Sequence, residues 1–138
     1  LRKLGRQAEA ETLARDIKTR LAAIKTAASA RDDVQVAAIA VDAFLGNQTA
    51  AREAADALAK HPSQDHLWII EDAPLLMVAY AELRDPDAAF DLAERAMDQL
   101  SPAHFANLRV DTAFDAYREL PRYRKLDARY QAWKAASK

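Results

Sequence analysis

The sequence predicts an all-α fold of stacked helical hairpins, and three observations predict it. About a quarter of the 138 residues are alanine, which has the highest helix propensity, and only two are glycine. Apolar residues recur at helical spacing, and β-branched residues never form an alternating run. Similar turns recur about 40 residues apart, which is the scale of helical-hairpin repeats.

The three turns share one pattern: a leucine, three or four polar or helix-breaking residues, and alanines that open another helix. They span Leu4–Ala10, Leu45–Ala51 and Leu83–Ala89. Gly46 can take a positive φ after a helix, and Pro86 suits the first position of the next one. The turns divide a single domain, residues 1–138, into an incomplete first hairpin (1–30), a second hairpin (32–62), a third hairpin (65–101) and a capping segment with a helix (102–138).

The first two predicted helices carry long apolar stripes. The stripe of the first consists of Leu13, Ile17, Leu21 and Ile24. In the second, Val36, Ile39 and Phe44 lie off the main stripe, so we expect neighbours on more than one side of this helix. The helix after Gly46 has a small-residue face that permits close approach to its partner, consisting of Ala51, Ala54, Ala55 and Leu58.

The third hairpin has two possible starts. Asp72 can cap a helix that has Pro74 in its first turn. If the helix instead begins near Asp65, Pro74 should kink it. Apolar stripes follow along Leu75–Leu83 and Phe90–Leu100.

The C-terminal segment differs from the hairpins. Aromatic and apolar residues between Leu108 and Leu120 have short, irregular spacing, and Pro121 then opens a last helix. This helix carries one apolar stripe, made of Tyr123, Leu126, Tyr130 and Trp133. Because a repeat array needs an atypical element over its last exposed face, we interpret this segment as a cap.

These features resemble tetratricopeptide repeats. Ala73–Leu83 resembles the first helix of that repeat, with Leu76 and Tyr80 at its leucine and tyrosine positions. The following helix has Ala89 and Ala96 at the two small positions. Together with the C-terminal signature described next, the resemblance covers roughly residues 4 to 126. It implies a tetratricopeptide-like helical-hairpin solenoid, an α-α superhelix with a C-terminal capping helix.

Asp115–Tyr123 resembles the signature Asp-Pro-Leu-Arg-x-Asp-Pro-Arg-Phe, which closes repeat arrays in bacterial signalling proteins. These proteins include winged-helix transcription activators, nucleotide cyclases and serine/threonine kinases. The resemblance implies that the chain belongs to a larger bacterial signalling or transcription-regulatory protein. Leu1–Leu4, which reads as the end of a helix, likewise predicts an upstream segment.

Composition and missing motifs exclude several kinds of chemistry. Without cysteine, the chain cannot form disulfides, thiolate zinc sites or a cysteine nucleophile. It has no phosphate-binding glycine loop and no hydrolase or zinc-protease motif. We therefore predict a non-catalytic protein without a cofactor. A net charge of −1 and the lack of a long apolar run predict no nucleic-acid or membrane partner. A cytoplasmic location is expected, with the periplasm as the alternative.

Two groups of polar residues have both a functional and a structural interpretation. His61 and His66, with Asp65 and Asp72 nearby, are a conceivable metal site, but surface histidines at helix ends are the preferred interpretation, so no metal is predicted. The acidic pairs Asp32–Asp33 and Glu71–Asp72 each precede an apolar run. There they stabilise helix N-termini more plausibly than they perform acid–base catalysis.

Charge is distributed unevenly. Glu71–Asp98 is acidic, whereas residues 121–138 are basic. Two solvated faces are the preferred interpretation, and an acidic surface that recruits a basic partner is the alternative. The basic tail also contains aromatic residues that could stack on nucleic acid, but their helical spacing favours burial.

The tetratricopeptide resemblance also implies a concave groove lined by first-helix residues. These residues are Asp33, Val36, Ala40, Ala43, Phe44, Glu71, Pro74, Val78, Ala81 and Glu82. An apolar floor with an acidic edge would suit an amphipathic helix or an extended peptide with a basic residue. We therefore predict a protein-interaction or scaffolding module. The alternatives are that neighbouring helices fill the groove, or that the chain is the small-molecule effector-sensing domain of a bacterial transcription regulator.

Overall fold

The computed structural model describes residues 5–27, 32–60, 70 and 72–137, and the regular elements within these ranges are all helical. The all-α prediction is therefore confirmed for this part of the chain. In order, the elements are α1 (Gln7–Ala27), α2 (Asp32–Phe44), α3 (Gln48–Ala59), α5 (Ala73–Glu82), α6 (Pro86–Gln99), the 3-10 helix η2 (Pro102–Phe105), α7 (Ala106–Val110), the 3-10 helix η3 (Thr112–Tyr117) and α8 (Pro121–Ala136).

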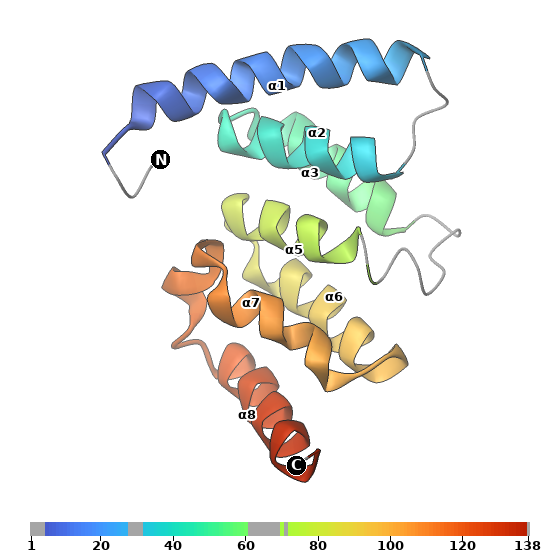
Figure 1. Cartoon of the computed structure of the whole chain (residues 1–138), viewed down its shortest axis with the longest axis vertical. Helices are drawn as coiled ribbons and strands as arrows, with labels where there is room; N and C mark the ends of the chain where they lie inside the picture. Colours follow the sequence, from blue (N-terminus) through green and yellow to red (C-terminus); the bar gives the residue numbers. More distant parts are fainter. Residues whose placement is uncertain (1–4, 28–31, 61–69, 71, 138) are drawn as a thin grey trace.

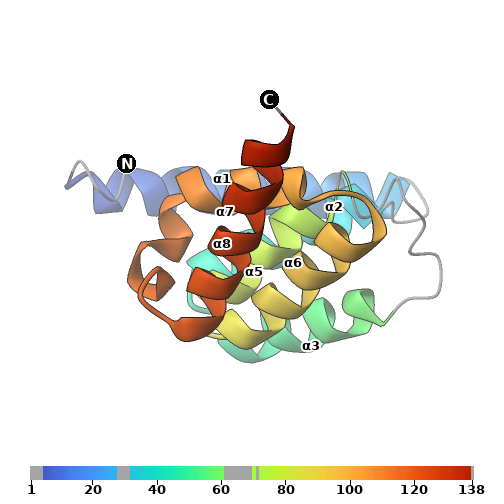
Figure 2. The ribbon, with the colours of Figure 1, turned by 90° about the horizontal axis from the view of Figure 1, so that it is seen from below.

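Two helical hairpins form the centre of the molecule. α2 packs against α3, α5 packs against α6, and the hairpins meet through α2 and α5 (Figure 1). In this view α2 and α5 lie in front of α3 and α6, and the view from below agrees (Figure 2). α1 packs on α2 at one end, and η2 and α8 pack on α6 at the other.

The two hairpin turns are closed by the same backbone hydrogen bonds. After α2, the amides of Gly46 and Asn47 donate to Ala43 and Asp42 at 3.2 and 2.9 Å. After α5, the amides of Arg84 and Asp85 donate in the same pattern to Ala81 and Tyr80, at 3.1 and 2.9 Å. Both turns place one residue in the left-handed region, Gly46 at φ 86° and Arg84 at φ 59°. This is the Schellman motif, so the predicted recurrence of these turns extends to their geometry.

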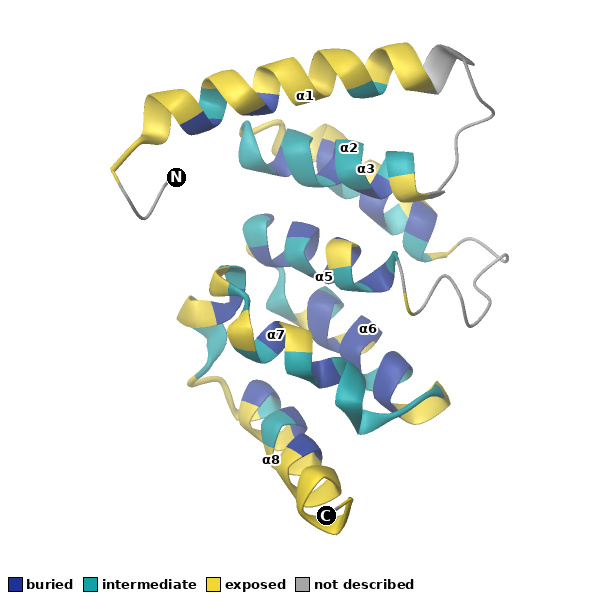
Figure 3. Ribbon diagram, in the orientation of Figure 1, coloured by how far each residue is buried: buried dark blue, intermediate teal, exposed yellow. Residues whose placement is uncertain are grey.

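Alanines allow the helices of each hairpin to approach closely. Ala51 and Ala55 of α3 and Ala89 and Ala93 of α6 are all buried. Larger side chains, among them Leu76 and Phe90, fill the space on either side, and the burial is densest in the two hairpins (Figure 3). The expected burial of α2 on more than one side is confirmed, since α1, α3 and α5 all contact it and every residue from Val34 to Phe44 is buried or partly buried.

α3 is also bound to the α5–α6 hairpin by polar contacts. The Tyr80 hydroxyl donates to Asp56 Oδ1 at 2.9 Å. Burial raises the pKa of Tyr80 well above its ordinary value, and the bond to Asp56 raises it further. Arg52 Nη1 contacts Asp85 Oδ2 at 2.5 Å, and the other oxygen of Asp85 caps α6 by accepting from the Ala88 amide at 3.1 Å.

The start of α5 distinguishes between the two alternatives left open by the sequence. The helix begins at Ala73 with Asp72 at the N-cap position and Pro74 in the first turn, but the Asp72 side chain does not form the expected capping hydrogen bond. A kink at Pro74 is therefore not needed, because proline is tolerated where no helical N–H bond is lost.

α1 corrects a prediction. It is helical over the expected residues, but Leu13, Ile17 and Ile24 of its predicted stripe are exposed. Its buried residues are Ala10 and Ala14, which belong to the face that packs on α2.

The C-terminal segment covers the outer side of the α5–α6 hairpin. Phe105, Phe114, Tyr123, Leu126 and Tyr130 join the main core. The stripe predicted for α8 is buried except at its end, because Trp133 lies beyond the hairpin and is 36% exposed. Among the described residues, no helix is both long and apolar enough to cross a membrane.

The two left-handed residues give a matched stability test. We expect Gly46→Ala to lower the free energy of unfolding by about 1 kcal/mol, because an L side chain is disfavoured at positive φ. No atom lies within 4 Å of the added Cβ, so the cost comes from the backbone. Arg84→Gly should leave stability unchanged or raise it. Urea unfolding followed by circular dichroism measures both, and a neutral Gly46→Ala would contradict the interpretation.

Asp85 should make stability depend on pH. Burial raises its pKa, but hydrogen bonds from the Ala88 amide and Arg52 outweigh that effect, so the pKa lies below its ordinary value. The stabilisation is therefore present above the ordinary aspartate pKa and is lost as pH falls through the lowered value. Asp85→Asn keeps a capping oxygen and removes the charge. We expect a loss of up to about 1 kcal/mol at neutral pH and a smaller loss in acid, measured by urea titrations across pH. An equal loss at every pH would contradict this.

Candidate functional site

The structure divides the predicted groove residues into two groups. Val36, Ala43 and Ala81 are buried in the core. α2 contacts α1, α3 and α5, which leaves these three residues at most 3% exposed. Val36 is enclosed by neighbouring helices, whereas Ala43 and Ala81 also line a hollow between the two hairpin turns, so their assignment to a groove stays a prediction.

The remaining predicted residues keep some accessible surface. Ala40, Phe44, Pro74, Val78 and Glu82 are partly exposed, and Asp33 is exposed at the start of α2. Ala40 and Val78 pack against the core with one side. Glu71 lies outside the described residues. The accessible part of the prediction therefore follows the outer side of α2 and α5 rather than a deep groove between them.

Leu75 is a further surface residue that the sequence analysis did not select. It lies one turn before Val78 on α5, and its side chain is 48% exposed. When the turns after α2 and α5 are aligned, Ala37 of α2 corresponds to Leu75, Ala40 corresponds to Val78, and Phe44 corresponds to Glu82. The sequence signal that could have identified Leu75 is a large apolar residue at a position where the α2–α3 hairpin has alanine. We call Ala37, Ala40, Phe44, Leu75, Val78 and Glu82 the outer strip.

A hollow of about 330 Å³ lies at the C-terminal end of the outer strip. Three segments that are distant in sequence enclose it: the turn after α2, the turn after α5, and η3. Its lining includes Phe44, Glu82, Arg84 and Tyr117. The Tyr117 hydroxyl donates to the carbonyl of Ala81 at 2.9 Å, which holds η3 against α5. Burial raises the pKa of Tyr117, so its phenol is a neutral donor at neutral pH.

The acidic and basic segments predicted as separate faces contact each other. Arg122 of α8 reaches Glu94 at 3.0 Å, Asp87 at 3.4 Å, and Asp91. Arg129 pairs with Asp98 at 2.6 Å. The hydrogen bond to Glu94 and the other α6 carboxylates raise the pKa of Arg122 above its ordinary value. The acidic side of α6 is thus matched by cations of the same chain.

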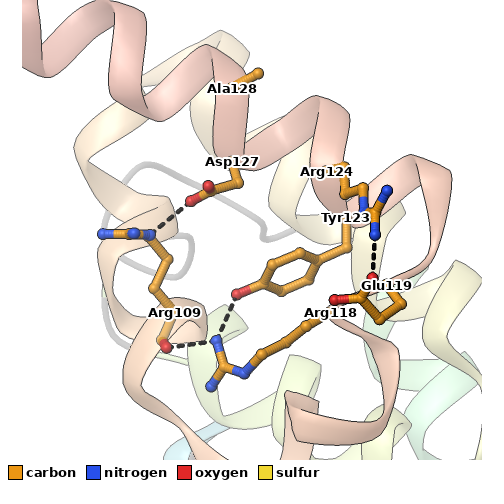
Figure 4. Close-up of a pocket in the computed structure, with 7 residues that line it drawn as sticks. All are labelled: Arg109, Arg118, Glu119, Tyr123, Arg124, Asp127 and Ala128. Atoms are coloured by element: carbon orange, nitrogen blue, oxygen red, sulfur yellow. Dashed lines mark hydrogen bonds and ion pairs between the residues drawn. The ribbon is translucent and has the colours of Figure 1, made fainter.

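A second pocket, of about 390 Å³, lies between α7, η3 and α8 (Figure 4). Arg109, Arg118 and Arg124 line it, which would suit an anion if their donors were available. However, Arg109 pairs with Asp127 at 2.5 Å, and Arg124 pairs with Glu119. This arrangement compensates two of the three positive charges inside the pocket.

Arg118 is the most fully bonded of these arginines. Nη1 donates to the carbonyl of Arg109 at 2.6 Å and to the Tyr123 hydroxyl at 2.8 Å, as Figure 4 shows. Nε and Nη2 donate to Asp115 Oδ1 at 3.1 and 2.9 Å. Nη2 also donates to the carbonyl of Asp111 at 3.3 Å. With all its nitrogens engaged, Arg118 joins η3 to α8 and is not a ligand-binding cation.

The signature-like segment Asp115–Tyr123 therefore has a structural basis. Arg118 holds the parts of the cap together, whereas Arg122 and Tyr123 hold the cap on α6. Arg122 also lies over the Phe90 ring at 5.8 Å. Tyr123 and Tyr130 are buried, so they cannot form the stacking surface considered for nucleic acid.

Three of the four residues considered as a metal site, His61, Asp65 and His66, lie outside the described residues. Within the described ranges, no group of three or more histidine or carboxylate side chains is arranged to hold a metal ion.

Comparison with known protein families, curated proteins and solved structures finds no match to this chain.

Arg118 and Arg124 offer a matched test of the cap. Arg118→Lys cannot keep the forked contacts, and we expect it to lower the free energy of unfolding by about 1–2 kcal/mol. Arg124→Lys changes an exposed pair and should change stability by less than about 0.5 kcal/mol. Chemical denaturation measures both, and similar values for the two variants would refute a structural role for Arg118.

Proposed function

We propose that the chain is a tetratricopeptide-like helical repeat that binds a peptide or partner helix without catalysing a reaction. The repeated Schellman turns support the repeat. So does the burial of Leu76, Tyr80, Ala89 and Ala96, at the positions that the resemblance selects. Membership of a larger bacterial signalling protein follows from the signature-like segment and is part of the same proposal.

The observation that carries the binding function is the hollow at the end of the outer strip. It joins two hairpins and the cap, and an exposed apolar strip leads into it along α5. Leu75 and Val78 offer an apolar contact on a rigid helix, and Phe44 offers an aromatic one. Binding surfaces commonly combine such anchors with a polar rim.

The charge near the hollow restricts the partner. The carboxylate of Glu82 and the Tyr117 hydroxyl lie in its lining, so a lysine or arginine of the ligand is the favoured polar group there. Because Arg84 lies in the same lining, the basic group should enter on the side of Glu82. We expect a short segment with an apolar residue over Leu75 and a basic residue at the hollow.

The test is to screen arrayed peptides that combine apolar and basic residues, and then to measure the affinity of those that bind. Leu75→Asp should weaken binding about tenfold or more, because burial of one leucine contributes about 1.5–3 kcal/mol. Glu82→Lys should remove the preference for a basic residue. Fluorescence anisotropy gives the dissociation constants.

Leu120→Asp is the matched control, since Leu120 is also an exposed leucine but lies at the N-cap of α8, where aspartate is favourable. Its affinity should equal that of the unchanged chain. If Leu75→Asp binds as tightly as Leu120→Asp, the outer strip is not the binding surface.

The second candidate function is small-molecule effector sensing, and the volume of the hollow favours it. About 330 Å³ lies at the lower end of the range for small-ligand sites. A sensor would gain thermal stability from a metabolite, whereas a peptide-binding module would gain it from the selected peptide. Thermal shift measurements with both ligand classes separate the two functions.

A further inference from the structure

α1 has an apolar face that no described residue covers. Leu13, Ile17 and Ile24 are 51%, 36% and 47% exposed, and their spacing places them on one stripe. Figure 3 shows α1 as mainly exposed along its length, unlike α2 and α3.

The fold indicates what shape would fit this face. α1 follows a positive-φ residue, Gly5, as α3 follows Gly46 and α6 follows Arg84. With the three turns aligned, Ile17 matches Leu58 and Ala96, which are both buried. In those hairpins an antiparallel first helix packs against the second one. The exposed side of α1 is therefore shaped for an antiparallel α-helix.

The charges of α1 indicate which helix that is. Its N-terminal half contains Glu9, Glu11 and Asp16 with one cation, Arg15, whereas Lys18, Arg20 and Lys25 follow in its C-terminal half. Lys18 pairs with Asp42 of α2 at 2.5 Å, which leaves Arg20 as the basic residue beside the stripe. An antiparallel pair of such helices places the acidic half of each against the basic half of the other. Asp16 and Arg20 border the stripe, contact each other at 2.9 Å, and keep side-chain exposures of 51% and 75%.

We propose that two copies of this chain associate through α1, with the helices antiparallel about a two-fold axis near Lys18. Leu13 of one copy packs against Ile24 of the other, and the two Ile17 side chains lie close to the axis. Asp16 of each copy faces Arg20 of the other, which forms a symmetric cluster of two carboxylates and two guanidinium groups. A symmetric interface of this kind repeats each contact.

Analytical ultracentrifugation of the 138-residue chain over a concentration series tests the association. The unchanged chain should reach the mass of two chains. Ile17→Asp should raise the dimer dissociation constant at least tenfold, because it places two carboxylates near the axis in place of apolar contact. Leu120→Asp is the matched control on another face and should still dimerise. A monomeric unchanged chain, or a dimer indifferent to Ile17→Asp, overturns the proposal.

Charge exchange tests the pairing. Asp16→Arg and Arg20→Asp should each weaken the dimer, and the double variant should restore it, because opposite charges again face each other. Circular dichroism monitors whether α1 stays helical, since both single variants also break the pair within the helix. Failure of the double variant to restore the dimer, with helix content unchanged, rejects the cluster.

Cross-linking tests the direction of the helices. The chain contains no cysteine, so each introduced thiol is unique. A short bismaleimide should join a Leu13→Cys copy to an Ile24→Cys copy, and should not join two Leu13→Cys copies. The reverse result would show parallel helices and would overturn the antiparallel arrangement.

Discussion

Close approach of paired helices through alanine is the constraint on which the rest of the structure depends. Ala51 and Ala55 in one hairpin, and Ala89 and Ala93 in the other, occupy the seam between helices and are buried. Alanine ends at Cβ, so the backbones can approach while Leu76 and Phe90 fill the neighbouring space. A larger residue in the seam would force the helices apart and would shift the turns that line the hollow. The alanine packing inside the hairpins thus determines the geometry of the outer surface.

The parts that could be predicted from the sequence are those governed by local interactions. Gly46 and Pro86 mark turns because their backbone preferences act within a few residues, and Asp72 with Pro74 marks the start of α5 for the same reason. Burial was predicted less well. Helical periodicity shows that Leu13 and Ile17 share a stripe, but it does not show which neighbour covers that stripe. The alanines Ala10 and Ala14 of α1 are buried, whereas Leu13, Ile17 and Ile24 are exposed.

The candidate site shows the same limit. The resemblance assigns Val36 to a groove, yet this residue is fully buried, because α1, α3 and α5 surround α2 in a way that one residue pattern cannot specify. Leu75 was missed because it was counted as core. The pairing of Arg122 with α6 also required the fold, since about 30 residues separate the two charges along the chain. Local signals located the elements, and only the packed structure located their accessible surfaces.

The contacts of Arg122 and Tyr117 have a consequence for how the chain reaches its folded state. Both tie the cap to helices of the adjacent hairpin, as α1 is tied to α2. Each element therefore docks on an adjacent hairpin, 28 residues away along the chain for Arg122 and Glu94 and 36 for Tyr117 and Ala81, which limits the loop-closure entropy that opposes docking. Either hairpin can serve as a nucleus onto which adjoining helices condense. Chains of this low contact order fold fast, and their order of assembly follows from which hairpin is locally the most stable.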